Sequence, residues 1–398
     1  MSHGHDDGTG SGNGLRPATK VVHSGRDPRR FDGFVNTPVV RGSTVLSATY
    51  DDLIHHRGRY SYGRRGNPTT EGFEAALKAL EGGDGIALTP SGLSACSISL
   101  LSVLGAGDHL LMVDTVYRPT RTFCEQVLKR LGVETTYYDP LVGAGIAGLI
   151  RDNTRAIFLE SPGSQSFEMQ DVPAITAVAR ARGITTLIDN TWATPLFFKP
   201  HAFGVDISIQ AGTKYIGGHA DLNLGTISAV GAAWKKVIAT HGTLGITISP
   251  DDAALGARGL RTLAVRLAQH QRSGLEMAQW LQERPEVSRV LHPALPSDPG
   301  HAIWKRDFCG ATGLFSLILK DVPERAVAAF FDALALFGMG YSWGGYESLA
   351  IPFDCSDYRT ATVWDVEGPG VRLHIGLEDV ADLKADLDQA FAKLRAAA

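Results

Sequence analysis

Three polar sites in the sequence each come within a few residues after a short, strand-like run. They are Ser91 with Gly92, Asp189, and Thr213 with Lys214. Alone, each site has an ordinary explanation: a helix cap for the serine, a turn for the aspartate, and one surface amine among many for the lysine. Together they supply an anion-binding turn, a carboxylate and an amine. Those groups hold a pyridoxal phosphate ring at both ends and covalently in the middle.

Alternating helical and strand-like stretches are the elements that must position these groups. From about residue 68, apolar residues at helical spacing alternate with β-branched runs, which is typical of a parallel sheet flanked by helices. Strands are predicted at 86–88, 109–113, 133–137, 156–159, 185–188 and 206–209. Helices are predicted from a start signal at 68–70 to a stop at 82–83, and at 120–131 and 172–182. Doubly wound sheets bind ligands at the carboxyl ends of their strands, so the three polar sites should meet there.

The remaining parts of the chain predict a smaller second domain and an N-terminal arm. A helix-compatible segment at 251–283 leads to further elements; these are strands near 314–319 and 371–375 and helices near 324–337 and 380–394. Residues before about 59 show no strong periodicity, and the first fourteen are rich in Gly, Ser and Asp. We therefore predict three regions, namely a flexible tail and an arm contacting a neighbouring subunit at 1–59, a large domain at 60–255, and a small domain at 256–398.

Length, composition and charge favour a two-domain protein that acts on a small molecule. A chain of 398 residues exceeds the length that one hydrophobic core usually organises, and 44% apolar residues are enough for a large core. The net charge is only -4, and lysine and arginine residues are spread along the chain. They form no basic stripe of the kind that binds nucleic acid or an anionic membrane. Four cysteines lack a CxxC pair, which argues against a zinc site or a disulfide framework. No apolar run could span a bilayer and the first residues lack a signal-peptide layout, so we predict a cytoplasmic protein without a metal.

Six blocks of sequence occur in an order shared with a known family. They are YGRRGNPTT (62–70), TPSGLSA (89–95), LIDNTWATP (187–195), QAGTKYIGGHAD (210–221), SWGGYESL (342–349) and RLHIGLED (372–379). From about residue 19 onward, the chain resembles the fold-type-I pyridoxal-phosphate enzymes of cysteine and methionine metabolism, and six ordered matches are more specific than any single motif. The resemblance implies an α/β fold whose large domain has a mainly parallel seven-stranded sheet flanked by helices. It also implies a smaller α/β C-terminal domain and pyridoxal 5'-phosphate as the cofactor.

The resemblance also implies the residues that handle the ring and the substrate. Lys214 carries the cofactor covalently; once the substrate amine displaces it, it can remove the Cα proton and deliver one to the departing sulfur. Asp189 faces the pyridine nitrogen and keeps it protonated. Tyr117 stacks on the ring and helps to take a proton from the incoming amino group, a core tyrosine being the alternative. Arg372 binds the substrate α-carboxylate through two parallel hydrogen bonds.

Phosphate recognition is implied for a further group of residues. They are the backbone amides of Gly92 and Leu93, the hydroxyl of Thr213 and, from the neighbouring subunit, Tyr62 and Arg64. Without the resemblance, Tyr62 and Arg64 would be read as an ordinary turn in a glycine-rich loop. One position departs from the family pattern, because many relatives carry serine where this chain has Ala211, so one phosphate hydroxyl is missing.

Residues on the substrate side select among the reactions of the family. SWGGYESL, which contains Ser342, Trp343 and Tyr346, resembles the branch that cleaves L-cystathionine by α,β-elimination. This branch yields homocysteine, pyruvate and ammonia in transsulfuration and methionine biosynthesis, and other cysteine S-conjugates are further candidate substrates. The alternatives are a γ-synthase or γ-lyase of the same family and a catalytically silent, cofactor-binding regulator. The resemblance further implies a homotetramer, a dimer of dimers whose active sites are shared between subunits.

Overall fold

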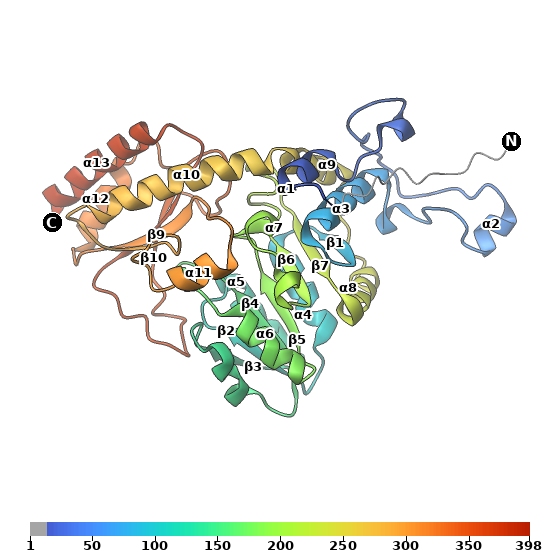
Figure 1. The fold of residues 1–398 in the computed structure, drawn as a ribbon, viewed down its shortest axis with the longest axis horizontal. Coiled ribbons are helices and arrows are strands. Elements are labelled where there is room, and N and C mark those ends of the chain that lie inside the picture. Colours follow the sequence, from blue (N-terminus) through green and yellow to red (C-terminus); the bar gives the residue numbers. More distant parts are fainter. Residues whose placement is uncertain (1–13) are drawn as a thin grey trace.

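The computed structural model describes residues 14–398, and the predicted tail up to residue 13 lies outside this range. Figure 1 shows two layered parts, one around a seven-stranded sheet and the other around a four-stranded sheet. The long helix α10 (Leu263–Gln282) runs along both parts and leads the chain from the first into the second.

The large sheet has seven strands in the order β1-β7-β6-β5-β4-β2-β3. Their bounds are β1 (Gly85–Thr89), β2 (His109–Val113), β3 (Glu134–Tyr138), β4 (Thr154–Glu160), β5 (Thr185–Asp189), β6 (Ile207–Gln210) and β7 (Gly225–Ala229). The pairs from β6 to β3 are parallel, whereas β7 runs antiparallel to both β1 and β6. Strands β1, β2, β6 and β7 are buried along their whole length, as expected for a sheet covered on both faces.

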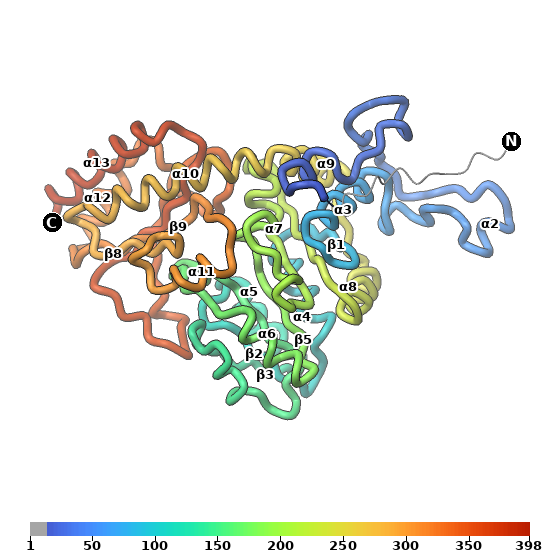
Figure 2. Tube along the Cα trace, in the orientation of Figure 1, coloured from blue at the N-terminus to red at the C-terminus, as the bar shows by residue number. Residues whose placement is uncertain are grey.

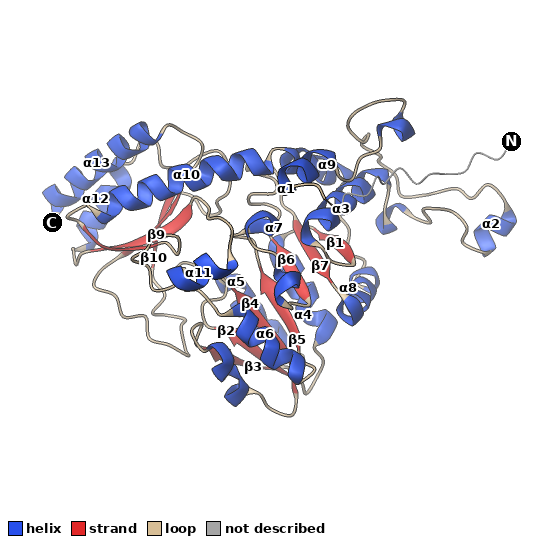
Figure 3. Cartoon of the chain, in the orientation of Figure 1, coloured by secondary structure: helices blue, strands red, loops and turns tan. Residues whose placement is uncertain are grey.

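Helices flank this sheet (Figure 3). They are α3 (Pro68–Glu81), α4 (Gly92–Val103), α5 (Arg118–Phe123), α6 (Val172–Ala181), α7 (Thr194–Phe197), α8 (Gly231–Thr243) and α9 (Pro250–Arg261). Helix α3 shows why the boundaries could be predicted. The Asn67 side chain and Thr70 form a capping box at its start, and Gly82, with φ of 81°, ends it in the left-handed region.

The small sheet has four antiparallel strands in the order β10-β11-β9-β8. Its strands are β8 (Val287–Leu291), β9 (Leu314–Leu319), β10 (Leu349–Phe353) and β11 (Gly370–His374). The accompanying helices are α11 (His301–Asp307), α12 (Glu324–Ala333) and α13 (Val380–Ala397). Helices α10, α12 and α13 pack on the sheet around a shared core that includes Met277, Phe330 and Phe391.

The predicted fold class is confirmed by this architecture, and the differences are local. Strand β7 was missed because its sequence, GTISA, is mostly small residues with Ile227 as its one large apolar side chain. Strands β8 and β10 were not predicted either. The helical segment predicted at 251–283 is interrupted at Thr262, which separates α9 from α10. The helix predicted at 120–131 is α5 followed by a single π-helical turn over Cys124–Leu128.

The N-terminal residues form an arm with two short helices, α1 (Pro17–His23) and α2 (Tyr50–Ile54). Helix α1 is fixed to the body, because Val21 is buried and its carbonyl accepts from the Arg261 guanidinium. The stretch around α2 extends away from the rest of the chain (Figure 2) and exposes Leu46 at 88%. Exposed apolar surface of this kind marks an interaction site, and the predicted contact with a neighbouring subunit stays a prediction. Within residues 14–398, no helix combines the length and apolarity that crossing a membrane requires.

Candidate active site

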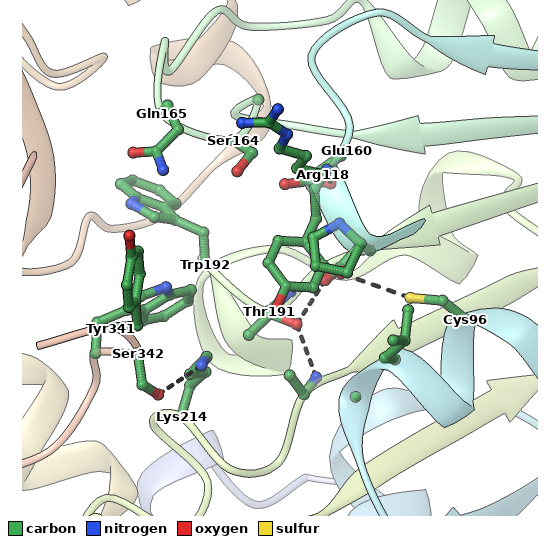
Figure 4. Close-up of a pocket in the computed structure, with 18 of the residues that line it drawn as sticks. Cys96, Arg118, Glu160, Ser164, Gln165, Thr191, Trp192, Lys214, Tyr341 and Ser342 are labelled. Atoms are coloured by element: carbon green, nitrogen blue, oxygen red, sulfur yellow. Dashed lines mark hydrogen bonds between the residues drawn. The ribbon is translucent and has the colours of Figure 1, made fainter. Parts of the chain in front are cut away.

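A cavity of about 1310 Å³ lies where the carboxyl ends of the large sheet face the small domain. Figure 4 shows side chains converging on it from both parts of the chain. The predicted residues that line it are Gly92, Leu93, Tyr117, Asp189, Ala211, Thr213, Lys214, Ser342, Trp343 and Arg372. The expectation that the three polar sites after strands meet at one sheet edge therefore agrees with the geometry.

Lys214 lies in the loop after β6, with its amine directed into the cavity. Its Nζ donates to the Ser342 hydroxyl at 2.6 Å and lies 5.5 Å from the Trp343 ring centroid. Burial, together with the positive charge of Arg372, lowers the pKa of this amine to about 8. About a tenth of the amine is therefore uncharged at pH 7, far more than for an ordinary lysine, and the uncharged amine is the form that attacks a carbonyl carbon.

Asp189 ends β5 and points its carboxylate at the same cavity. One oxygen accepts from the Thr191 hydroxyl at 2.5 Å and from the Thr191 amide at 3.0 Å, and the other lies 3.9 Å from the Cys96 sulfur. Burial raises the pKa of this carboxyl above its usual range. Among the described residues no salt bridge reaches Asp189, and the charge of Lys214 offsets only part of the effect of burial, so this carboxylate could bind a positively charged group of a ligand.

The start of helix α4 lies beside the loop after β6 and has the form of a turn that could bind an anion. Ser91 caps the helix by accepting from the Ser94 amide at 3.1 Å, which leaves the first amides of the helix open toward the cavity. A Cβ at Gly92 would lie 2.4 Å from the Cβ of Ala211, so the close approach of the two loops requires glycine. The Thr213 hydroxyl donates to the Leu224 carbonyl at 3.2 Å and accepts from its amide at 2.9 Å. The Thr213 hydroxyl has one hydrogen to donate, so it could donate to a phosphate only if its hydrogen bond to the Leu224 carbonyl were broken.

Arg372 lies on β11 and brings a guanidinium from the small domain to the cavity. It is only 9% exposed, and its Nη2 donates to the Ser342 carbonyl at 3.0 Å. Its Nε is buried without a partner in the described part of the chain. Burial lowers the pKa of Arg372 to about 10, which still leaves it charged at neutral pH. A buried cation with an unused donor fits a carboxylate ligand.

The segment that carries Ser342 and Trp343 crosses directly over Lys214. A Cβ at Gly344 would lie 2.9 Å from the carbonyl carbon of Lys214, so only glycine allows this crossing. Ser342 has φ of 81°, an unusual value for a residue other than glycine. Its hydroxyl and carbonyl bind the amine of Lys214 and the guanidinium of Arg372, so this strained residue links the two cationic groups.

Tyr117 precedes helix α5 and is held by a residue that the sequence analysis did not single out. The Tyr117 amide donates to the Glu160 carboxylate at 2.7 Å. Burial raises the pKa of the Tyr117 phenol, as does the negative charge of Asp189. Glu160 ends β4 and Thr191 follows β5, so the rule of polar residues after strands could have found both.

Three predicted residues lie outside the cavity of their own subunit. Tyr346 is 55% exposed and does not line it. Tyr62 is 44% exposed, and the Arg64 guanidinium lies 5.7 Å from its ring centroid. Arg64 lines a separate cavity of about 260 Å³ beside Gly242.

Comparison with known proteins assigns this arrangement to a family. The family of Cys/Met metabolism PLP-dependent enzymes matches residues 18–392. The chain belongs to this family. The "Cystathionine beta-lyase" of Salmonella typhimurium is 45% identical over 94% of this chain and 98% of its own length. A relative from Wolbachia pipientis, named "L-alanine/L-glutamate racemase", is 39% identical over 96% of this chain and 98% of its own length.

A solved member of the family has the same fold over nearly the whole chain. The structure of cystathionine gamma synthase from Xanthomonas oryzae pv. oryzae, in complex with aminoacrylate and cysteine, superimposes with a TM-score of 0.89. It is 31% identical, and the match covers 96% of this chain and 100% of that one. Members named for different reactions therefore share this scaffold, so the choice among reactions must rest on side chains at the site.

Membership in the family makes this protein a pyridoxal-phosphate-dependent enzyme, and its own residues fit that cofactor. Asp189 offers a carboxylate without a salt-bridge partner among the described residues to a pyridinium nitrogen, and Lys214 offers a buried amine of lowered pKa to the aldehyde. The turn at Gly92 leaves helix amides open to a phosphate. These three groups occupy one cavity and match the three functional ends of the cofactor.

Proposed function

We propose that this enzyme is a carbon–sulfur β-lyase that cleaves L-cystathionine by α,β-elimination. L-Cystathionine and water give L-homocysteine, pyruvate and ammonia, a step of transsulfuration and methionine biosynthesis. The observation that carries the proposal is the placement of the Lys214 amine, with its pKa of about 8, beside Ser342 and Arg372 in one cavity. Identity of 45% to an enzyme named cystathionine beta-lyase supports the same reaction.

The chain's residues divide the work of the reaction by position. When bound, pyridoxal phosphate supplies an electron sink for the pair left on the substrate Cα. Arg372 holds the substrate α-carboxylate with its unused Nε and a second donor, and this fixes the direction of the Cα–H bond. Lys214 removes that proton and later donates one to the departing sulfur. Asp189 keeps a positive charge on the ring nitrogen, and Tyr117 takes a proton from the substrate amino group.

We assign phosphate binding to the amides of Gly92 and Leu93, to Thr213, and to Tyr62 and Arg64 of a neighbouring subunit. Tyr62 and Arg64 lie outside the cavity of their own subunit, and the arm that leads to them exposes apolar side chains. Both features support an assembly in which each active site draws residues from two chains. The proposed assembly is a cytoplasmic homotetramer, a dimer of dimers.

The substrate-side segment favours the β-lyase reaction within the family. The Trp343 ring centroid lies 5.5 Å from the Lys214 amine and the Ser342 hydroxyl accepts from that amine, which supports a role for both residues near the substrate Cβ. Tyr346 belongs to the same segment, and its contribution to the leaving-group pocket is part of the proposal. A γ-lyase or γ-synthase would have to move electrons one carbon further along the chain.

The experiment that tests the function is product analysis with purified protein and L-cystathionine. Pyruvate and homocysteine in equal amounts are the expected result. 2-Oxobutyrate would instead identify γ-elimination, and D-alanine from L-alanine without pyruvate from cystathionine would identify a racemase. Absence of any turnover by the cofactor-loaded protein would identify a regulator and overturn the proposal.

A further inference from the structure

A segment of the small domain, residues 354–362, returns to the large domain and closes one side of the cavity; we call it the wall segment. It follows β10, and Asp114 at the end of β2 fixes it. The Asp114 carboxylate accepts from the amides of Thr360, Ala361 and Thr362 at 3.0, 3.0 and 3.1 Å. The hydroxyls of Thr360 and Thr362 add contacts at 3.3 and 3.1 Å. One fully buried carboxylate therefore holds three consecutive residues of a segment about 246 positions away in the sequence.

Two buried arginines complete this anchor. Arg121 donates to Asp114 at 2.6 Å, and the Nε of Arg359 lies 3.4 Å from the other carboxylate oxygen. Arg359 also binds Glu168 at 2.6 Å, and both arginine side chains are only 3% exposed. Although burial raises the pKa of Asp114, the amide donors and Arg121 hold it below its usual range. The Asp114 carboxylate is therefore charged and multiply hydrogen-bonded, which restrains the wall segment, although the Nε of Arg121 is buried without a partner among the described residues.

The anchored segment presents an ion pair to the cavity. Asp357 accepts from Arg118 at 2.6 Å, and the Arg118 guanidinium lies 5.1 Å from the ring centroid of Tyr358. All three residues line the cavity, and Arg118 directly follows Tyr117, which lies beside the cofactor groups. Figure 4 shows Arg118 on the far side of the cavity from Lys214. Among the described residues, the Nε and Nη1 of Arg118 and the Oδ1 of Asp357 have no hydrogen-bond partner, so the pair has spare donors and a spare acceptor.

An exposed ion pair by itself contributes little to stability. The pair of Arg118 and Asp357 differs from such a pair. Asp357 belongs to the wall segment, which the buried Asp114 network holds, and the guanidinium of Arg118 lies over the ring of Tyr358. Side-chain exposures of 59% for Arg118 and 53% for Asp357 leave both accessible from the cavity. A guanidinium and a carboxylate side by side are complementary to a zwitterion, whose carboxylate and ammonium also lie side by side.

We propose that Arg118 and Asp357 bind the amino-acid end of the leaving half of the substrate. Arg118 takes its carboxylate and Asp357 takes its ammonium, and Asp114 is the positioning residue that holds Asp357 in place. The inference rests on the proposed function and refines it: the preferred thioethers carry an amino-acid group at both ends. Arg372 binds the reacting end, and the pair binds the other.

The test compares two substrates that differ only in the leaving half. L-Cystathionine has a zwitterion there, and S-ethyl-L-cysteine has none. In Asp357→Asn and Arg118→Gln, the ratio of kcat/KM for L-cystathionine to that for S-ethyl-L-cysteine is expected to fall about tenfold. The fall should appear in KM, because the pair does not touch the reacting atoms. Glu134→Gln is the matched control, since it removes another exposed arginine pair, Arg151 with Glu134 at 2.5 Å, which does not line the cavity.

Asp114→Asn tests the positioning role through non-additivity. It is expected to lower the same ratio, and the double variant with Asp357→Asn should lower it little further, because a misplaced Asp357 already contributes nothing. Where Asp114→Asn does not fold, Thr360→Val with Thr362→Val removes two of the donors and should give a smaller fall in the same direction.

Each outcome has a distinct meaning. Equal losses on both substrates, or no loss beyond that of Glu134→Gln, would overturn the subsite while leaving the proposed function in place. Additive losses in the double variant would overturn the role of Asp114. Absence of pyruvate from both substrates with the wild-type enzyme would overturn the proposed function and the subsite together.

Discussion

The inner and outer halves of the cavity are built in different ways. The inner half is positioned by the large sheet, where Asp189 ends β5 and Lys214 lies in the loop after the neighbouring parallel strand β6. The outer half stands on loops, and its wall segment is fixed by contacts between residues far apart in the sequence. With the proposed roles, the difference separates two tasks: the sheet would place the groups that every reaction of the family needs, and the loops would place those that distinguish substrates.

The largest effect should come from the inner half, through Lys214→Ala. It removes both the covalent anchor and the proton carrier, so kcat for L-cystathionine should fall by at least about 10³-fold. Pyruvate release measures the activity, and borohydride should no longer attach the cofactor to the chain. Lys393→Ala, at an exposed lysine of α13, is the control. Retained steady-state turnover in Lys214→Ala would remove the basis of the mechanism.

Arg372→Lys should have the next largest effect, because it keeps a charge but loses the planar pair of donors. We expect kcat/KM for L-cystathionine to fall about 10- to 100-fold, with the visible spectrum of the bound cofactor unchanged. Steady-state kinetics and absorbance spectra of the same preparation check this. An altered spectrum with ordinary kcat/KM would mean that Arg372 serves the cofactor instead of the substrate.

The sequence allowed the inner half to be predicted because its signals are local. A polar residue that follows a β-branched run is visible within a few positions, as for Asp189 and Lys214. Glu160 obeys the same rule and was overlooked. The anchor of the wall segment could not be predicted, since nothing near Asp114 indicates that residues about 246 positions later bind it. The engagement of the Thr213 hydroxyl by Leu224 likewise depends on tertiary structure.

The shared site extends the comparison to a second subunit. If Arg64 reaches the phosphate of a neighbour, Lys214→Ala and Arg64→Ala subunits should complement each other. In a hybrid dimer one site inherits both defects, and the other combines an intact Lys214 with an intact Arg64. Random pairing makes about half of the dimers hybrid with one good site each, so activity should recover to roughly a quarter of wild type.

Mixing the two inactive variants under conditions of verified subunit exchange provides the measurement. Two preparations of Lys214→Ala that carry different tags give the control for exchange without complementation. Failure to recover any activity would show that Arg64 serves its own subunit or does not bind phosphate.

The smallest effect should be on the free energy of unfolding of the cofactor-free protein, through the buried charge of Lys214. Lys214 has a folded-state pKa of about 8, against roughly 10.4 for an unfolded lysine. Between these values the unfolded chain binds more protons than the folded one, so the free energy of unfolding should rise with pH. Well below pH 8 the buried charge is fully present and destabilises the fold. Lys214→Met removes this charge, so the stability gained by this variant should be largest near pH 7 and should shrink as the pH approaches 10.

Urea unfolding of wild type and variant across that range measures the gain, with Lys393→Met as the exposed control. A gain that stays constant with pH would mean that the amine is as well solvated in the folded cavity as in the unfolded chain.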